Sequence, residues 1–235
     1  MNTHFLYLII DAVCLLSTVM FSFHSKINFH KLFKPFFKSC FCVAVFFILW
    51  DLAFTKLGVW SFNSKYLAGI YFFNLPIEEV LFFFCIPYPC VFTYHCIKTF
   101  IKKNKSSKIG NYFNYALIIG LLIIAILNPT KIYTSITFLL TALVILFATK
   151  QQPNYLYHFY TSFSIILLPF FISNGILTGS FTDEAVVIYN NTYNLGFRLF
   201  TIPFEDVFYG LLLILLNVLL FEKFQESPQK ISTIS

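Results

Sequence analysis

Seven stretches of the sequence are apolar over roughly the length that crosses a bilayer. They are residues 4–23, 36–54, 76–97, 112–128, 132–149, 157–174 and 201–221. A membrane-spanning helix needs about 20 mostly apolar residues, and only helices or closed barrels satisfy every backbone hydrogen bond within lipid. The runs are continuous and do not alternate, which favours helices. We therefore expect an all-α, polytopic transmembrane bundle of about seven helices.

The composition excludes a water-soluble enzyme. Apolar residues make up 58% of the 235 residues and charged residues only 11%, and the mean hydropathy is +0.78. A soluble domain carries about 25% charged residues, so this chain lacks the polar surface that would cover a globule in water. The fourth and fifth runs are separated only by residues 128–131, and they form either an antiparallel hairpin or one broken segment.

Basic residues fall mainly in two short clusters, within a net charge of +6. The clusters are Lys26, Lys31, Lys34 and Lys38, and then Lys98, Lys102, Lys103, Lys105 and Lys108. Loops rich in lysine stay in the cytoplasm, so we expect an inner-membrane protein with its N-terminus outside and its C-terminus inside. A nucleic-acid surface would interleave basic residues with stacking aromatics in a water-exposed groove, so we expect no nucleic-acid partner.

Cysteines and glycines give no sign of a metal or a dinucleotide. The six cysteines include no C-x-x-C pair and no Cys/His spacing of the zinc type. The eight glycines include no G-x-G, so the dinucleotide fingerprint is absent. We expect no metal and no cofactor, and we interpret the cysteines as reduced packing residues.

The chain contains an internal repeat. Phe54–Val80 aligns with Phe181–Val207 at an offset of 127 residues, without a gap. The identical pairs are Phe54/Phe181, Thr55/Thr182, Asn63/Asn190, Tyr66/Tyr193, Gly69/Gly196, Phe73/Phe200, Pro76/Pro203, Glu78/Glu205 and Val80/Val207. We expect an N-terminal half of three helices, 1–108, and a C-terminal half of four, 109–235. Because four helices separate the copies, both have the same orientation in the membrane, as in a parallel repeat.

Each half contains a pair of acidic residues at the start of a predicted helix. Glu78 and Glu79 follow Pro76 in the motif PIEE, and the second half has PFED at 203–206. Proline and acidic residues suit a helix start, which is a sufficient structural explanation on its own. An uninterrupted apolar run follows each pair, however, and carboxylates at membrane depth are usually functional. Neighbouring carboxylates repel each other, so we expect one acid of each pair to keep its proton beside an ionised base.

An acid and a base in an apolar, aromatic surround suit the protonation of an alkene. The resulting carbocation needs a dry acid, aromatic faces and a weak base. The chain has 33 Phe, 14 Tyr and 2 Trp, although most of these are expected to face lipid or to form interfacial belts.

Two segments, Trp50–Tyr94 with PIEE and Ile202–Glu222 with PFED, resemble the membrane-integral lycopene cyclase family. In some bacteria and archaea the two parts are paired subunits, and in fungi they are fused to phytoene synthase. The resemblance covers nearly the whole chain and implies that both parts lie in one polypeptide. It implies cofactor-independent, redox-neutral cyclisation of the ψ-ends of lycopene to β-rings, giving γ- and β-carotene. Lycopene or another linear carotenoid, membrane lipid and other carotenoid enzymes are the implied partners.

The acid–base set implied by the resemblance is Glu78, Glu79, Glu205 and Asp206. Candidate substrate-binding or supporting residues are Asp51, Trp60, Asn63, Tyr66, Asn190, Tyr193, Arg198, Phe82, Phe83 and Tyr209. Asp51 either completes the acidic cluster or caps a helix. The repeated Asn and Tyr residues either orient carboxylates or pin the loop, and Arg198 either pairs with an acid or anchors the chain at the interface. Asp11 is expected to face the bundle interior.

Two other functions remain open from the sequence. A carotenoid 1,2-hydratase would form the same cation and capture it with water. A small lipid transporter or lipid-binding protein would also show duplicated halves, but it needs polar residues on several helices along a path. The sequence leaves open which carboxylate donates the proton, whether the ring is β or ε, and whether one or both ends react.

Overall fold

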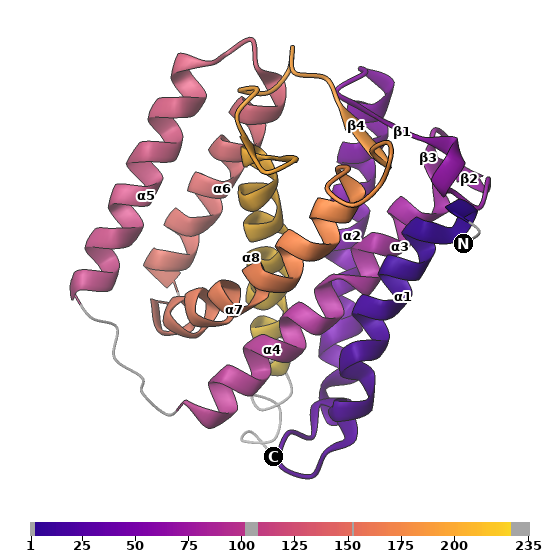
Figure 1. Ribbon diagram of the computed structural model, residues 1–235. Helices are drawn as coiled ribbons and strands as arrows, with labels where there is room; N and C mark the ends of the chain where they lie inside the picture. The colour runs from indigo at the N-terminus through magenta and orange to yellow at the C-terminus, as the bar shows by residue number, and fades with distance from the viewer. Residues whose placement is uncertain (1–2, 102–107, 152, 227–235) are drawn as a thin grey trace.

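The computed structural model describes residues 3–101, 108–151 and 153–226. Within these residues, seven helical spans are long and apolar enough to cross a membrane. They are Leu6–Phe23, Phe29–Lys56, Ile77–Phe100, Gly110–Leu127, Ile132–Gln151, Tyr155–Leu177 and Phe204–Gln225. The predicted all-α bundle of about seven helices is therefore confirmed (Figure 1). Lys102, Lys103 and Lys105 of the second lysine cluster lie outside the described residues.

The helices and strands follow one another in a simple order. The α-helices are α1 (Leu6–Val19), α2 (Phe33–Lys56), α3 (Ile77–Cys85), α4 (Pro87–Phe100), α5 (Lys108–Leu127), α6 (Ile132–Gln151), α7 (Pro153–Leu177) and α8 (Phe204–Glu226). The 3-10 helices are η1 (Thr3–Phe5), η2 (Met20–Phe23), η3 (Phe29–Leu32) and η4 (Ser64–Tyr66). The strands are β1 (Trp60–Phe62), β2 (Tyr71–Phe72), β3 (Leu75–Pro76), β4 (Val187–Tyr189), β5 (Arg198–Leu199) and β6 (Ile202–Pro203).

Two features of the helix map depend on proline and on short connections. The third span is divided between α3 and α4 at Ile86, immediately before Pro87, which cannot donate the helical hydrogen bond at that point. α5 and α6 pack directly against each other across the short connection at 128–131, so the hairpin interpretation is confirmed. α8 lies in the middle of the bundle and contacts α2, α4, α6 and α7.

A short antiparallel strand pair joins the two halves on one side of the bundle. β1 pairs with β4, and Ser61 lies opposite Ile188, its own equivalent in the repeat. Asn63 N–H donates to Val186 O at 2.8 Å. The matching bond, from Asn190 N–H to Val59 O, is 2.9 Å long. The halves are thus related by a local two-fold axis through the Ser61–Ile188 pair.

Each half also has a small hairpin that leads into its acid-bearing helix. β2 pairs with β3, and β5 pairs with β6 in the same register 127 residues later. The tips are Phe73 and Phe200, with φ of 54° and 59° and exposed fractions of 82% and 88%. A positive φ is unusual for a bulky residue, so this backbone geometry repeats along with the sequence. Exposed aromatic tips suit the membrane interface.

At the opposite end of the bundle a buried ion pair ties α4 to α8. Glu222 is 2% exposed, and Lys98 Nζ donates to both of its carboxylate oxygens at 2.6 Å. Tyr94 OH donates to Glu222 Oε1 at 2.9 Å. A buried carboxylate needs such partners, because its desolvation is costly.

Removing the cation of this pair should destabilise the bundle. Lys98→Met would leave Glu222 with the Tyr94 hydroxyl, and we expect the free energy of unfolding to fall by about 1–2 kcal/mol. The loss is smaller than for a fully buried pair because the Lys98 side chain is 37% exposed. Thermal unfolding in detergent would measure it against Lys38→Met, where the lysine is exposed. Equal unfolding temperatures for the two variants would contradict this role.

Candidate functional site

The two acid pairs occupy the first turns of α3 and α8, directly after Pro76 and Pro203. All four carboxyl groups are buried: Glu78 and Glu205 are 0% exposed, Glu79 is 8% and Asp206 is 5%. Each helix start is fixed by the preceding hairpin, since Ile77 N–H donates to Ile70 O and Phe204 N–H donates to Phe197 O. The acids therefore lie inside the protein and not at its solvated surface.

The first acid of each pair holds the loop before its helix. Glu78 Oε1 accepts a hydrogen bond from Ala68 N–H at 2.7 Å. Glu205 Oε1 accepts the equivalent bond from Leu195 N–H at 2.8 Å, and also one from Thr134 Oγ1 at 2.5 Å. The second oxygen of each of these two acids is buried and has no hydrogen-bond partner among the described residues.

The second acid of each pair accepts a hydrogen bond from a tyrosine, and the two tyrosines lie on equivalent helices, α1 and α6. Tyr7 OH of α1 donates to Glu79 Oε2 at 2.7 Å. Tyr133 OH of α6 donates to Asp206 Oδ1 at 2.6 Å. Both phenols are buried beside these acids. Each half therefore presents the same hydroxyl–carboxylate unit to the interior.

Asp206 has two further donors. Asn174 Nδ2 of α7 and Tyr189 OH of β4 each donate to its Oδ2 at 2.9 Å. Burial, followed by the nearby Asp206 charge, raises the pKa of Tyr189 well above its usual value, so the phenol stays protonated as a donor. Three donors on one buried carboxyl group favour its ionised form.

Asp51 joins the other side of the cluster. Tyr209 OH of α8 donates to Asp51 Oδ1 at 2.7 Å, and the carboxyl groups of Asp51 and Glu79 lie close enough to interact. Two buried carboxyl groups at such close range can share one proton. Asp206 is close enough to interact electrostatically with both Asp51 and Glu79. The site thus brings two neighbouring carboxyl groups together beside a third one that has three hydrogen-bond donors.

Aromatic rings surround this cluster. Trp60 lies 5.2 Å from Tyr133 between ring centroids, with the rings in an edge-to-face arrangement. Tyr209 lies 5.0 Å from Phe47 and 5.4 Å from Trp50. In a desolvated site, an aromatic face can stabilise a cation by about 2 kcal/mol or more.

Other predicted supporting residues lie in the loops. Asn63 Oδ1 accepts from Lys65 N–H, and Asn190 Oδ1 accepts from Thr192 N–H at the matching position. The side-chain N–H groups of Asn63 and Asn190 donate to Glu184 Oε2 and Gly58 O, not to the four acids. These contacts support the loop-pinning alternative for the asparagines. Tyr66 and Tyr193 end the same turns, each donating its backbone N–H to the carbonyl of the asparagine three residues earlier.

Arg198 bonds to neighbours other than the acids. Its guanidinium donates to Thr201 O at 2.6 Å and to Asn191 Oδ1 at 3.0 Å. It lies 6.0 Å from the centroid of Tyr189, the phenol that donates to Asp206. Its link to the acid cluster in the structure is therefore indirect.

Phe82 and Phe83 pack behind Glu79 on α3. Phe82 lies 6.4 Å from Tyr7 in an edge-to-face arrangement. Phe83 is fully buried and lies 5.7 Å from Phe47. These rings fill the space between α1, α2 and α3.

Asp11 is 1% exposed and faces the interior, as expected, one helical turn from Tyr7. Neither of its carboxyl oxygens has a hydrogen-bond partner among the described residues. It is close enough to Glu79 and Glu78 to interact with their charges. An unpaired charge would be costly there, so the neutral acid is the favoured form.

Several contact residues were missed from the sequence: Tyr7, Tyr133, Thr134, Asn174 and Tyr189. Tyr7 and Tyr133 occupy the same place in their halves, but they are 126 residues apart, so the 127-residue offset places Tyr7 opposite Thr134. A one-residue gap before the aligned segment would have revealed the pair. Asn174 and Tyr189 gave no repeated signal, because their equivalents are Phe47 and Phe62.

Comparison with protein families decides the classification. A family model described as lycopene cyclase matches residues 4–97 and 130–224, which is most of the chain. The chain belongs to the lycopene cyclase family. The two matched segments contain the two acid pairs, while the whole of α5 lies between the segments. No match was found among curated proteins or solved structures.

Membership of this family gives the protein a broad role. It is an integral membrane enzyme of carotenoid cyclisation. The resemblance noted from PIEE and PFED is confirmed, and so is the repeat, because the family match covers both halves. The division of the chain at residues 108 and 109 stays a prediction.

Loop pinning can be separated from carboxylate orientation by one substitution. Asn190→Ala removes the cap on the Thr192 N–H, and we expect the free energy of unfolding to fall by about 1 kcal/mol. Carotenoid cyclisation per folded molecule should stay within about two-fold of the native rate. Thermal unfolding in detergent and pigment analysis would measure both, with Thr192→Ala as the control that keeps the N–H. A large loss of turnover with unchanged stability would favour a direct role at the acids.

Proposed function

We propose that the protein is a lycopene β-cyclase that closes the linear ψ-ends of lycopene into β-rings without a cofactor, giving γ- and β-carotene. The observation that carries this proposal is the meeting of Glu79, Asp51 and Asp206 in one buried, aromatic-lined site. The reaction is an isomerisation, so it needs one proton delivered and one removed, and no electrons.

The Asp51–Glu79 pair is the proposed acid. The proton shared by the two carboxyl groups is transferred to C2 of the ψ-end, and the C1=C2 bond becomes a cation at C1. Tyr7 and Tyr209 donate to the carboxylates that remain, which stabilises the charge left behind. General acid catalysis of this kind contributes roughly 10²–10⁴-fold.

The ring closes through two carbocations. The C5=C6 bond attacks C1, which forms the C1–C6 bond and moves the positive charge to C5. The rings of Trp50, Trp60 and Tyr209 lie around the cluster and can stabilise both cations.

Asp206 is the proposed base. Its three donors favour its ionised form, and its weak basicity suits removal of a proton from a carbocation. Loss of the proton from C6 forms the C5=C6 bond of a β-ring, whereas loss from C4 would give an ε-ring. The proton then returns to the Asp51–Glu79 pair, and the enzyme is restored.

Glu78 and Glu205 have a different proposed role. Each accepts a backbone N–H of the loop that precedes its helix, and so positions the neighbouring acid. This divides the four predicted acids into two that carry protons and two that position them.

The burial of the site supports cyclisation over hydration. Asp51 is 2% exposed and Asp206 is 5% exposed, so a cation formed between them meets a carbon–carbon double bond before it meets bulk water. We place the protein in the inner membrane with its lysine-rich loops in the cytoplasm, which puts the acid cluster toward the outer face.

Pigment analysis tests the function directly. Expression in a lycopene-accumulating host should convert lycopene to γ- and β-carotene, identified by chromatography against standards. A hydroxylated acyclic pigment would instead establish a hydratase. Unchanged lycopene, with the protein present in the membrane, would contradict both activities.

Substitutions separate the proposed roles of the acids. Glu79→Gln and Asp206→Asn should each lower the rate of ring formation at least about 100-fold. Glu78→Gln keeps an acceptor for Ala68 N–H, so we expect it to retain at least about a tenth of the native rate. Asp183→Asn, in a loop between α7 and β4, is the control and should have the native rate. Equal losses in Glu78→Gln and Glu79→Gln would contradict the division.

A further inference from the structure

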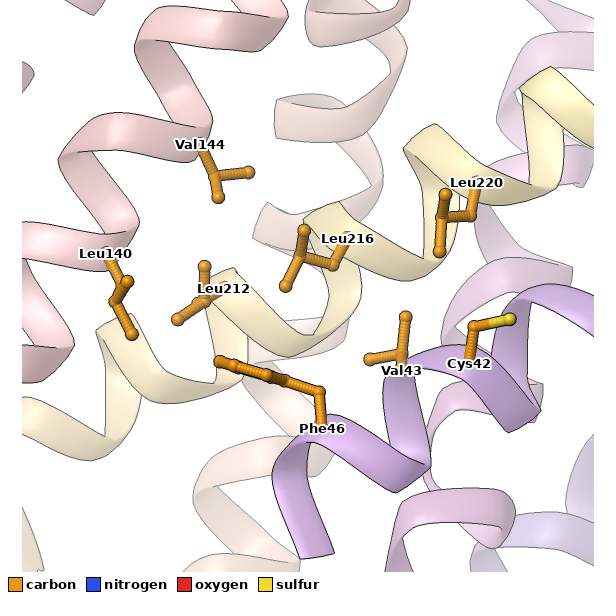
Figure 2. Close-up of a pocket in the computed structure, with 8 residues that line it drawn as sticks. All are labelled: Cys42, Val43, Phe46, Leu140, Val144, Leu212, Leu216 and Leu220. Carbon is orange, nitrogen blue, oxygen red and sulfur yellow. The ribbon is translucent and has the colours of Figure 1, made fainter. Parts of the chain in front are cut away.

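An apolar groove lies between α2, α6 and α8, apart from the acid cluster (Figure 2). Its volume is about 270 Å³. The lining residues are Cys42, Val43, Phe46, Leu140, Val144, Leu212, Leu216 and Leu220. The groove opens to one side, where Cys42 and Phe46 are exposed, and Val43 and Leu212 are buried at its base.

The side chains that line the groove limit the kind of ligand that it can bind. All the lining side chains are hydrocarbon except the thiol of Cys42, so the groove offers no strong hydrogen-bond donor or acceptor. Its volume is slightly below the range of about 300–1,000 Å³ that is usual for ligand pockets. It therefore suits a stretch of a long apolar chain and not a whole molecule with polar groups.

The groove and the acid site share two helices, α2 and α8. On α8, Leu212 is one turn beyond Tyr209, whose hydroxyl donates to Asp51. On α2, the ring centroids of Phe46 and Trp50 are 5.9 Å apart, and Trp50 immediately precedes Asp51 in the sequence. At 1.5 Å per residue, Leu212 lies about 9 Å along the helix from Asp206, and Leu220 lies about 21 Å from it.

We propose that this groove binds the polyene chain of the substrate while the ψ-end lies at the acid cluster. The inference rests on the proposed function and adds the path of the chain to it. The shared helices lead an extended chain away from Asp206 along α8, with its distal part in the lipid. An acyl chain of a membrane phospholipid is the competing occupant. Lycopene would displace that chain from the groove only if lycopene itself binds there.

Filling the groove should block binding of the polyene. In a Glu79→Gln background, which is expected to bind without turnover, we would purify the protein from lycopene-containing membranes and measure bound lycopene per protein by visible absorbance. Adding Leu216→Trp should lower bound lycopene about 10-fold. Leu49→Trp places the same ring on the lipid face of α2, where Leu49 is 62% exposed, and should leave binding unchanged.

A second measurement needs no change in the groove. Cys42 is the exposed cysteine of the six, and its alkylation by N-ethylmaleimide in vesicles of fixed lipid composition should be slowed at least about five-fold by lycopene. Equal alkylation rates with and without lycopene, or native lycopene binding and turnover in Leu216→Trp, would overturn the groove assignment. Failure of the native chain to form any ring, while lycopene still protects Cys42, would overturn the proposed function and leave the groove assignment supported.

Discussion

The structure depends on hydrogen bonding to carboxyl groups that are buried at membrane depth. Such groups are costly unless donors from the protein replace water. Asp206 illustrates the solution, since its three donors come from α6, α7 and β4 and therefore fix the positions of three separate elements around α8. The hydrogen bonds that stabilise this carboxylate therefore also hold the elements at the centre of the bundle together.

The duplicated halves each contribute an acid to the site, and differences between the copies give these two acids different partners. Glu79 and Asp206 are equivalent residues, and their tyrosine donors lie on the equivalent helices α1 and α6. The next helix of each copy then differs, because α2 contributes the carboxyl group of Asp51 and α7 contributes the amide of Asn174. A carboxyl partner can share a proton with its neighbour, whereas an amide N–H can only donate one hydrogen bond. A nearly symmetric fold can in this way place an acid opposite a base.

The sequence identified the acid pairs but not the division of work within them. PIEE and PFED predicted four buried acids at two helix starts, and the structure places all four there. Adjacent residues on a helix point in directions about 100° apart, so Glu78 faces its loop while Glu79 faces the interior. The pattern also missed Tyr7 as a partner, because the donor lies 72 residues away on another helix.

The sequence by itself determined the seven spans, their common orientation in the two halves, and the family, because apolar length and repeated motifs are local properties of the chain. The tertiary structure decided which carboxyl groups lie close together, which tyrosines and which asparagine donate to them, and which helices enclose an apolar groove. These depend on which helix faces meet. Hydropathy specifies that a helix is in the membrane, but lipid and protein interior are equally apolar, so only packing between helices determines which face each one buries.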